Sequence, residues 1–151
     1  MVPQVVRSAV IQAPAAKIFA LITQAERNSE WVPDLERSER LTPGETRIGT
    51  RFRFVSRIGP IPVDVTDEVV QLVPDRHIAF RGVSGPSHAG SWSFQPEPAA
   101  DGSEGATNVT YRMEFELPPG VGPIVSRMID LPRRLDDQAQ ACLSNLRRIL
   151  E

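Results

Sequence analysis

The strongest constraint on the fold is a region of period-two alternation that runs from residue 51 to residue 117. Within it, successive segments place apolar side chains at every second position, and clusters of glycine, proline or serine separate them. Because neighbouring side chains of a β-strand point to opposite faces, each segment is predicted to be a strand with one inward face. The short connections predict an antiparallel meander. The predicted inward residues are Phe52, Phe54, Ser56, Ile58, Val63, Val65, Asp67, Val69, Ile78, Phe80, His88, Gly90, Trp92, Phe94, Val109, Tyr111, Met113, Phe115 and Leu117.

The residues before this region predict a strand followed by two short helices. Residues 4–12 are rich in valine and isoleucine and are typical of a strand. Residues 14–25 begin with a proline and carry apolar side chains at i, i+3, i+4 and i+7, which predicts a helix. Residues 26–34 are predicted to form a second short helix or a turn. Residues 35–42 are highly charged, so we expect a weak strand at an edge of the sheet.

The chain closes with a long amphipathic helix, predicted over residues 123–150. Its apolar stripe consists of Ile124, Met128, Leu131, Leu135, Ala139, Cys142, Leu146 and Ile149. Pro132 lies inside this pattern. Because proline removes one helical hydrogen bond and clashes with the preceding turn, we predict a kink or break near Leu131.

Composition excludes several classes of protein. A chain of 151 residues with 40% hydrophobic residues is predicted to form one domain over residues 1–151 with a core of ordinary size. One cysteine allows no internal disulfide and no multi-thiolate zinc site. The net charge of -2 lacks the basic excess of a generic nucleic-acid binder. No apolar segment has the roughly 20 residues that span a membrane. We expect a cytoplasmic monomer or homodimer that does not insert into membranes.

Several short motifs, in this order and spacing, resemble the START-like helix-grip superfamily (SRPBCC), and within it the polyketide cyclase/dehydrase group. They are Val10-Ile11-Gln12-Ala13-Pro14, Trp31-Val32-Pro33, Gly49-Thr50-Arg51, Val69-Val70-Gln71-Leu72-Val73-Pro74-Asp75-Arg76, Thr107-Asn108-Val109-Thr110 and Leu146-Arg147-Arg148-Ile149-Leu150-Glu151. The resemblance covers essentially the whole chain. It implies an α+β helix-grip fold, in which a curved seven-stranded antiparallel sheet surrounds a long C-terminal helix and two short helices follow the first strand.

The resemblance also implies a cavity between sheet and C-terminal helix that holds a hydrophobic or aromatic small molecule. For such a site we expect a volume of about 300 to 1,000 Å³. The alternative is that the same side chains fill a dry core. The predicted ligand-binding residues are Phe52, Phe54, Val65, Ile78, Phe80, Trp92, Phe94, Met113, Phe115, Met128, Leu131 and Leu135.

Polar residues on the inward faces are the candidates for chemistry, because a buried polar group must be paired or must serve a ligand. His88, Asp67 and Tyr111 are the candidate acid–base residues. For Asp67 the alternative, which we favour, is a β-bulge that turns the carboxylate to solvent and leaves Val70 and Leu72 facing inward. For His88 we favour an exposed position at the rim, and Tyr111 could equally pair with the backbone.

Two further inward polar positions come from the same patterns. Ser56 lies on the inward face of its segment, and Ser8 would face inward if Val6 and Val10 do. Trp31 and Trp92 could flank the mouth of the cavity or only pack.

Other chemistries have little support. His77 and His88 are predicted on opposite faces, so no metal site is expected. A triad of Ser91, His88 and Asp67 is discounted because Ser91 should face away from His88. The segment Gly120-Val121-Gly122 lacks the context of a dinucleotide loop and is predicted to be a hinge. We expect no cofactor.

Two functions follow, and a third stays open. The first is binding of a hydrophobic or aromatic small molecule, such as a lipid, an isoprenoid or a polyketide-like compound. The alternative is an enzyme of the polyketide cyclase/dehydrase kind, which would need one or two proton-transfer groups and no cofactor. At least two of His88, Asp67 and Tyr111 should then lie within reach of each other in one cavity. A protein-interaction module is the third possibility.

Overall fold

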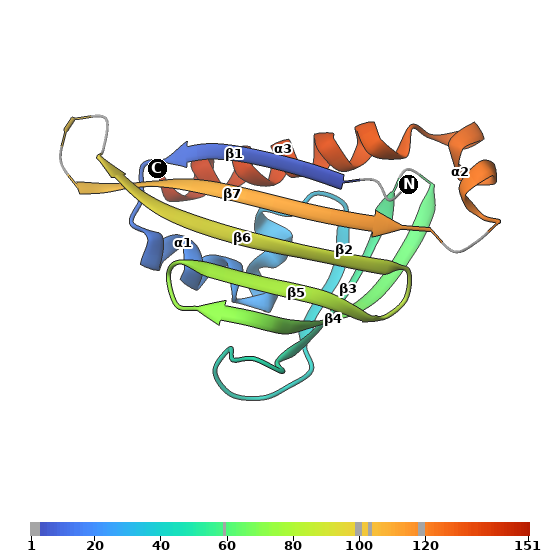
Figure 1. Ribbon diagram of the computed structural model, residues 1–151, viewed down its shortest axis with the longest axis horizontal. Coiled ribbons are helices and arrows are strands. Elements are labelled where there is room, and N and C mark those ends of the chain that lie inside the picture. The colour runs from blue at the N-terminus through green and yellow to red at the C-terminus, as the bar shows by residue number, and fades with distance from the viewer. Residues whose placement is uncertain (1–3, 59, 99–100, 103, 118–119) are drawn as a thin grey trace.

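The computed structural model describes residues 4–58, 60–98, 101–102, 104–117 and 120–151, and its elements follow the predicted order (Figure 1). They are β1 (Gln4–Ile11), α1 (Ala15–Ile22), the 3-10 helix η1 (Ala25–Glu30), β2 (Leu35–Arg40), β3 (Arg51–Ile58), β4 (Ile61–Val73), β5 (His77–Ser84), β6 (Ser87–Pro98), β7 (Glu104–Glu116), α2 (Gly122–Met128) and α3 (Leu131–Leu150).

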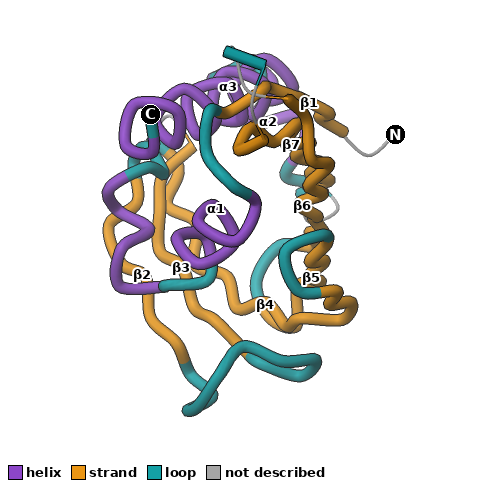
Figure 2. The backbone as a smooth tube through the Cα atoms, turned by 90° about the vertical axis from the view of Figure 1, so that its left-hand side faces the viewer, coloured by secondary structure: helices purple, strands orange, loops and turns teal. Residues whose placement is uncertain are grey.

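Within the described residues, the strands form one seven-stranded antiparallel sheet with the order β1-β7-β6-β5-β4-β3-β2. The predicted helix-grip fold and the edge position of β2 are therefore confirmed. The sheet curls into a half-barrel. Figure 2 shows α1 inside the curve and α3 along the open side, next to β1. This arrangement lets both helices bury their apolar faces against the concave face of the sheet.

The predicted break in the C-terminal helix is confirmed. The backbone of Ile129 is extended, which separates α2 from α3. Pro132 lies in the first turn of α3, where its missing N–H leaves no hydrogen bond unmade. The carboxylate of Asp130 caps α3 by accepting a hydrogen bond of 3.3 Å from the backbone N–H of Arg133.

The condition for an inward Ser8 on β1 is not met. Val5 is buried, whereas Val6 is 45% exposed. Ser8 is exposed as well, and its hydroxyl shares a hydrogen bond of 2.9 Å with that of Thr110. The physical reason is α3, which covers the other face of β1 and supplies Asp136 as the ion-pair partner of Arg7. The number of apolar residues on each face of this valine-rich strand does not show which face is buried.

The core consists of two clusters of buried side chains. The first lies around α1, η1 and the end of α3 and includes Ile18, Trp31, Trp92, Phe94 and Leu146. The second lies between the sheet, α2 and the start of α3 and includes Val65, Phe115, Val125, Leu131 and Leu135. The half-buried rings of Phe54 and Tyr111 pack against both clusters. The place where the clusters meet is therefore marked by aromatic side chains.

Candidate functional site

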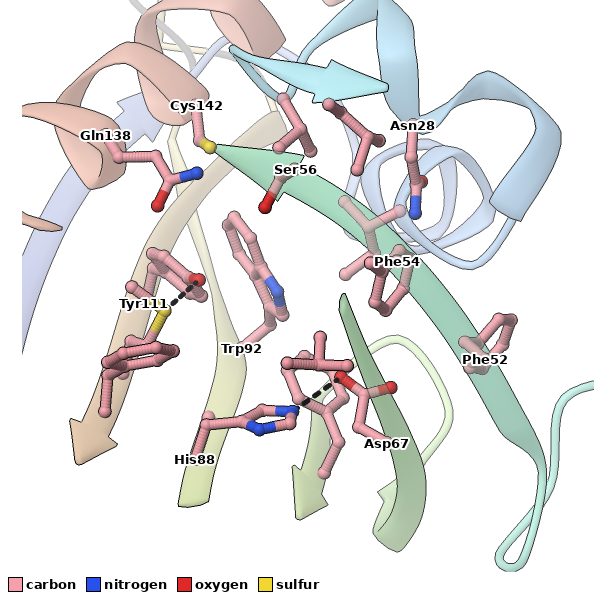
Figure 3. A pocket seen from close by; sticks show the side chains of 18 of the residues that line it. Asn28, Phe52, Phe54, Ser56, Asp67, His88, Trp92, Tyr111, Gln138 and Cys142 are labelled. Carbon is pink, nitrogen blue, oxygen red and sulfur yellow. Dashed lines mark hydrogen bonds and ion pairs between the residues drawn. The ribbon is translucent and has the colours of Figure 1, made fainter. Parts of the chain in front are cut away.

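A pocket of about 180 Å³ lies where the two core clusters meet, between the concave face of the sheet and α3 (Figure 3). Its volume is below the expected range. Nine of the twelve predicted ligand-binding residues line it, namely Phe52, Phe54, Val65, Ile78, Phe80, Trp92, Met113, Phe115 and Leu135. All three candidate acid–base residues line it too, namely Asp67, His88 and Tyr111.

The other three predicted ligand-binding residues lie elsewhere. Phe94 is buried in the first cluster, where its ring packs edge-on against Phe19 at 6.3 Å. Leu131 is buried in the second cluster. Met128 is 56% exposed, so its prediction as a lining residue is wrong. The cause is the break before α3, which takes Met128 out of the apolar stripe of that helix and places it on the outer side of α2.

Asp67 faces the pocket and is 5% exposed, which overturns the predicted bulge that would turn it to solvent. Pairing between β4 and β5 does shift register, both beside Asp67 and after Val69. The second shift lies at Val70, which is exposed, and Leu72 returns to the inner side. The inward series on β4 therefore continues through Asp67 to Val69.

His88 is also inside the pocket rather than at an exposed rim, because its side chain is only 11% exposed. Its Nδ1 lies 2.8 Å from the carbonyl oxygen of Pro86. A carbonyl only accepts, so Nδ1 carries a proton and donates it. Its Nε2 then faces Asp67 Oδ2 at 3.6 Å, the contact drawn in Figure 3. Two of the predicted proton-transfer groups thus lie together in one cavity.

Burial and mutual contact shift the pKa of both groups. Burial raises the pKa of the Asp67 carboxyl, and the nearby His88 only partly offsets this effect. Burial alone would lower the pKa of His88, but Asp67 and the carbonyl of Pro86 outweigh it and raise that pKa. Both shifts favour the protonated form of the group concerned, so the Asp67–His88 pair binds a proton more readily than the same two groups would in water.

Tyr111 completes the candidate set but stands apart from the pair. Its ring stacks on Trp92 with centroids 4.2 Å apart and planes at 20°. Its hydroxyl donates a hydrogen bond of 3.2 Å to Met113 Sδ, not to the backbone. Burial raises the pKa of this phenol far above its usual range, so the hydroxyl stays protonated. It can therefore donate to a ligand but not act as a base.

The strand pattern could not identify the lining residues that come from helices. They include Asn28 on η1, and Gln138 and Cys142 on α3. A signal for Gln138 did exist, because it stands three residues after Leu135 and four before Cys142, on the apolar stripe of the helix. Burial raises the pKa of the Cys142 thiol to about 12, so it is not a nucleophile at neutral pH.

The part of the chain that the structure describes contains neither a metal-binding cluster nor a membrane-spanning helix. Within it, no three histidine, cysteine, aspartate or glutamate side chains gather where they could hold a metal ion. Among the described helices, none combines the length and apolar character needed to cross a bilayer.

Solved structures share the fold over nearly the whole chain. The protein TTHA0849 from Thermus thermophilus is 20% identical, with 98% of this chain and 97% of that chain covered and a TM-score of 0.79. A START superfamily protein from Mycobacterium smegmatis is 15% identical, with 97% and 96% covered and a TM-score of 0.76. The Zhui aromatase/cyclase from Streptomyces sp. R1128 is 17% identical, with 99% and 96% covered and a TM-score of 0.68.

Comparison with curated proteins yields no match. The family model described as "Polyketide cyclase / dehydrase and lipid transport" matches residues 2–151. The chain therefore belongs to the polyketide cyclase/dehydrase and lipid transport family.

Proposed function

We propose that this protein binds an apolar, aromatic small molecule in the pocket between its two core clusters. The observation that carries the proposal is the lining, which is aromatic and aliphatic except for a few polar groups that include the Asp67–His88 pair. Pockets for small ligands commonly combine apolar walls with a few polar groups that orient the ligand. Family membership supports the same conclusion, since the family includes lipid transport.

The volume limits the size of the ligand. A dry cavity of about 150 Å³ is large enough to hold benzene. The pocket of about 180 Å³ thus suits one ring or two fused rings. Larger members of the proposed ligand class, such as long isoprenoids or sterols, would need side chains to move.

Fluorescence titration with naphthalene tests this proposal, because Trp31 and Trp92 both line the pocket. We expect saturable quenching with one site. Val65→Phe should weaken binding at least tenfold, since the larger ring occupies the pocket. Val70→Phe is the matched control on the exposed side of the same strand and should bind like the wild type. Absence of saturable binding to naphthalene and to its hydroxylated derivatives would refute the proposal.

A second candidate function is proton transfer to and from a bound ketone, as aldol-type ring closure or loss of water would require. The specific observation in its favour is the distance of 3.6 Å between His88 Nε2 and Asp67 Oδ2 inside the pocket. In this scheme the pair takes a proton from the carbon next to a carbonyl. The resulting enolate attacks a second carbonyl of the same molecule, and the pair returns the proton to the new alkoxide.

Deuterium exchange at C1 of 2-tetralone, followed by NMR in D2O, tests this second function without knowledge of the natural substrate. We expect the wild type to accelerate exchange above the buffer rate, and His88→Gln to lose at least 90% of that acceleration. Ser91→Ala is the control, because Ser91 follows on the same strand without lining the pocket. If the protein binds 2-tetralone but exchange proceeds at the buffer rate, the proposed proton transfer is wrong and the proposed ligand binding stands.

The remaining expectations stay predictions. They are one domain over residues 1–151, a cytoplasmic location and a monomer or homodimer. Limited proteolysis, cell fractionation and light scattering of the purified protein would test them in turn.

A further inference from the structure

Buried polar atoms without a hydrogen-bond partner gather around the pocket. Among the described residues, four buried side-chain atoms lack a hydrogen bond, namely Asn28 Oδ1, Trp31 Nε1, Arg40 Nη1 and His88 Nε2. Three of the four belong to residues that line the pocket. Buried polar atoms are nearly always hydrogen-bonded, and leaving one unpaired costs about 1 to 3 kcal/mol. His88 Nε2 has Asp67 Oδ2 as an ion-pair partner at 3.6 Å, so the two atoms beside the cavity without a partner are Asn28 Oδ1 and Trp31 Nε1, and they point to a ligand that pairs with them.

Asn28 and Trp31 come from η1 and its C-terminal cap, and each is 5% exposed. The amide nitrogen of Asn28 donates to Ser38 Oγ at 3.3 Å, which leaves its oxygen as the unpaired acceptor. The indole of Trp31 packs edge-on against Trp92 at 5.6 Å. The carbonyl of Trp31 accepts a hydrogen bond of 3.0 Å from Asn145 on α3. Both residues are therefore held in place before any ligand binds.

The two unpaired atoms have opposite hydrogen-bonding roles. An indole N–H only donates, and an amide oxygen only accepts. A hydroxyl is the smallest group that can accept a hydrogen bond from Trp31 Nε1 and donate one to Asn28 Oδ1. A bare hydrocarbon would leave both unpaired, and an ether or ketone oxygen would leave Asn28 Oδ1 unpaired.

The Asp67–His88 pair lies at a different part of the pocket. Figure 3 shows Asn28 on one side of Phe54 and Asp67 on the other, with Trp92 beside them. A ligand that lies along these rings can present one oxygen to η1 and a second to His88. The polar groups at these two parts of the pocket thus determine where the ligand carries its two oxygen atoms, and the apolar lining favours an aromatic ring system between them.

We propose that the pocket selects hydroxylated aromatic compounds, whose hydroxyl binds Trp31 Nε1 and Asn28 Oδ1 while the opposite side of the ring system faces the Asp67–His88 pair. This inference rests on the proposed function, because it specifies the ligand class of the same pocket. It adds Trp31 and Asn28 as residues that determine specificity.

The test is calorimetric titration of the wild type with naphthalene, 2-methoxynaphthalene and 2-naphthol. From the strength of one or two such hydrogen bonds, 2-naphthol should bind roughly 5- to 100-fold more tightly than naphthalene. The ether, which accepts but cannot donate, should lie between them. Trp31→Phe should bring the ratio of the naphthalene and 2-naphthol dissociation constants close to one, and this ratio is the readout because Trp31 also forms part of the pocket wall. Asn28→Leu should reduce 2-naphthol to the level of the ether.

Ser91→Ala is the control, because it removes a hydroxyl on β6 that does not line the pocket. It should keep the preference for 2-naphthol. If the wild type binds naphthalene and 2-naphthol equally well, the selection of hydroxylated ligands is wrong and aromatic binding stands. If none of the three compounds binds, the proposed function fails as well. The comparison in the wild type decides between these outcomes even if a variant does not fold.

Discussion

Asp67 on β4 and His88 on β6 meet across Gly82 of the intervening strand β5. Asp67 pairs directly with Gly82 in the ladder between β4 and β5. A Cβ atom added at Gly82 would lie 2.5 Å from the imidazole ring of His88. The missing side chain therefore provides the space in which the imidazole reaches the carboxylate at 3.6 Å. A side chain at this position would force the imidazole of His88 to shift.

Gly82→Ala should displace His88 and break its contact with Asp67. Without the carboxylate, the buried imidazole loses a cause of its raised pKa, so we expect the pKa of His88 to fall. Overpacking should also lower the free energy of unfolding by about 1 to 3 kcal/mol. NMR titration of the imidazole and urea unfolding measure the two effects. Gly122→Ala is the control, since an added Cβ there meets no atom within 4 Å; an unchanged His88 pKa in Gly82→Ala would contradict the prediction.

The Asp67–His88 pair should make the protein less stable as the pH rises. Both pKa values are raised in the folded state, so the folded protein holds more protons than the unfolded chain once the pH exceeds the ordinary values of 3.8 and 6.5. The free energy of unfolding then falls with increasing pH. Between pH 5.5 and 8.5, urea unfolding should show a larger loss of stability in the wild type than in Asp67→Asn, in which the imidazole lacks its charged partner. An equal or steeper loss in the variant would disprove this linkage.

Removing only the hydroxyl of Tyr111 should have a small effect on stability. The stacked ring on Trp92 remains in Tyr111→Phe, and only a hydrogen bond to a thioether is lost. We expect a change below about 1 kcal/mol for Tyr111→Phe, against about 3 kcal/mol or more for Tyr111→Ala, which opens a cavity. Thermal unfolding compares the two variants. If Tyr111→Phe keeps its stability but slows deuterium exchange of 2-tetralone, the hydroxyl contacts the ligand.

The cap at Asp130 should stabilise α3 independently of the pocket. Asp130→Ala removes the side-chain acceptor for the backbone N–H of Arg133, which should lower the free energy of unfolding by about 0.5 to 2 kcal/mol. Asp137→Ala, at an exposed site inside the same helix, is the control and should change little. Equal effects of the two substitutions in urea unfolding would show that the cap contributes nothing. Naphthalene binding should be unchanged in both variants.

Local patterns were sufficient to predict most of the fold. Alternation along β3 to β7 identified the more apolar side of these strands. The solvent-exposed positions favoured for Asp67 and His88 are wrong, because alternation alone does not show whether a polar side chain on that side is buried. Pro132 predicted the break before α3, since the backbone cost of proline inside a helix does not depend on the rest of the protein. The inward face of β1 and the exposure of Met128 could not be predicted in this way, because both depend on where α2 and α3 lie.

The sequence by itself determined the order of the elements, the alternation that groups Asp67, His88 and Tyr111 with apolar neighbours, and the apolar character of the pocket walls. It did not determine whether Asp67 and His88 face the pocket or the solvent. Only the tertiary structure decided that Asp67 and His88 meet, because their contact depends on strand register and on the absence of a side chain at Gly82. The same holds for Asn28 and Trp31, whose unpaired atoms are visible only after η1 has packed over the sheet. Periodicity reports which way one element faces, whereas a binding site is formed by side chains from several elements at once.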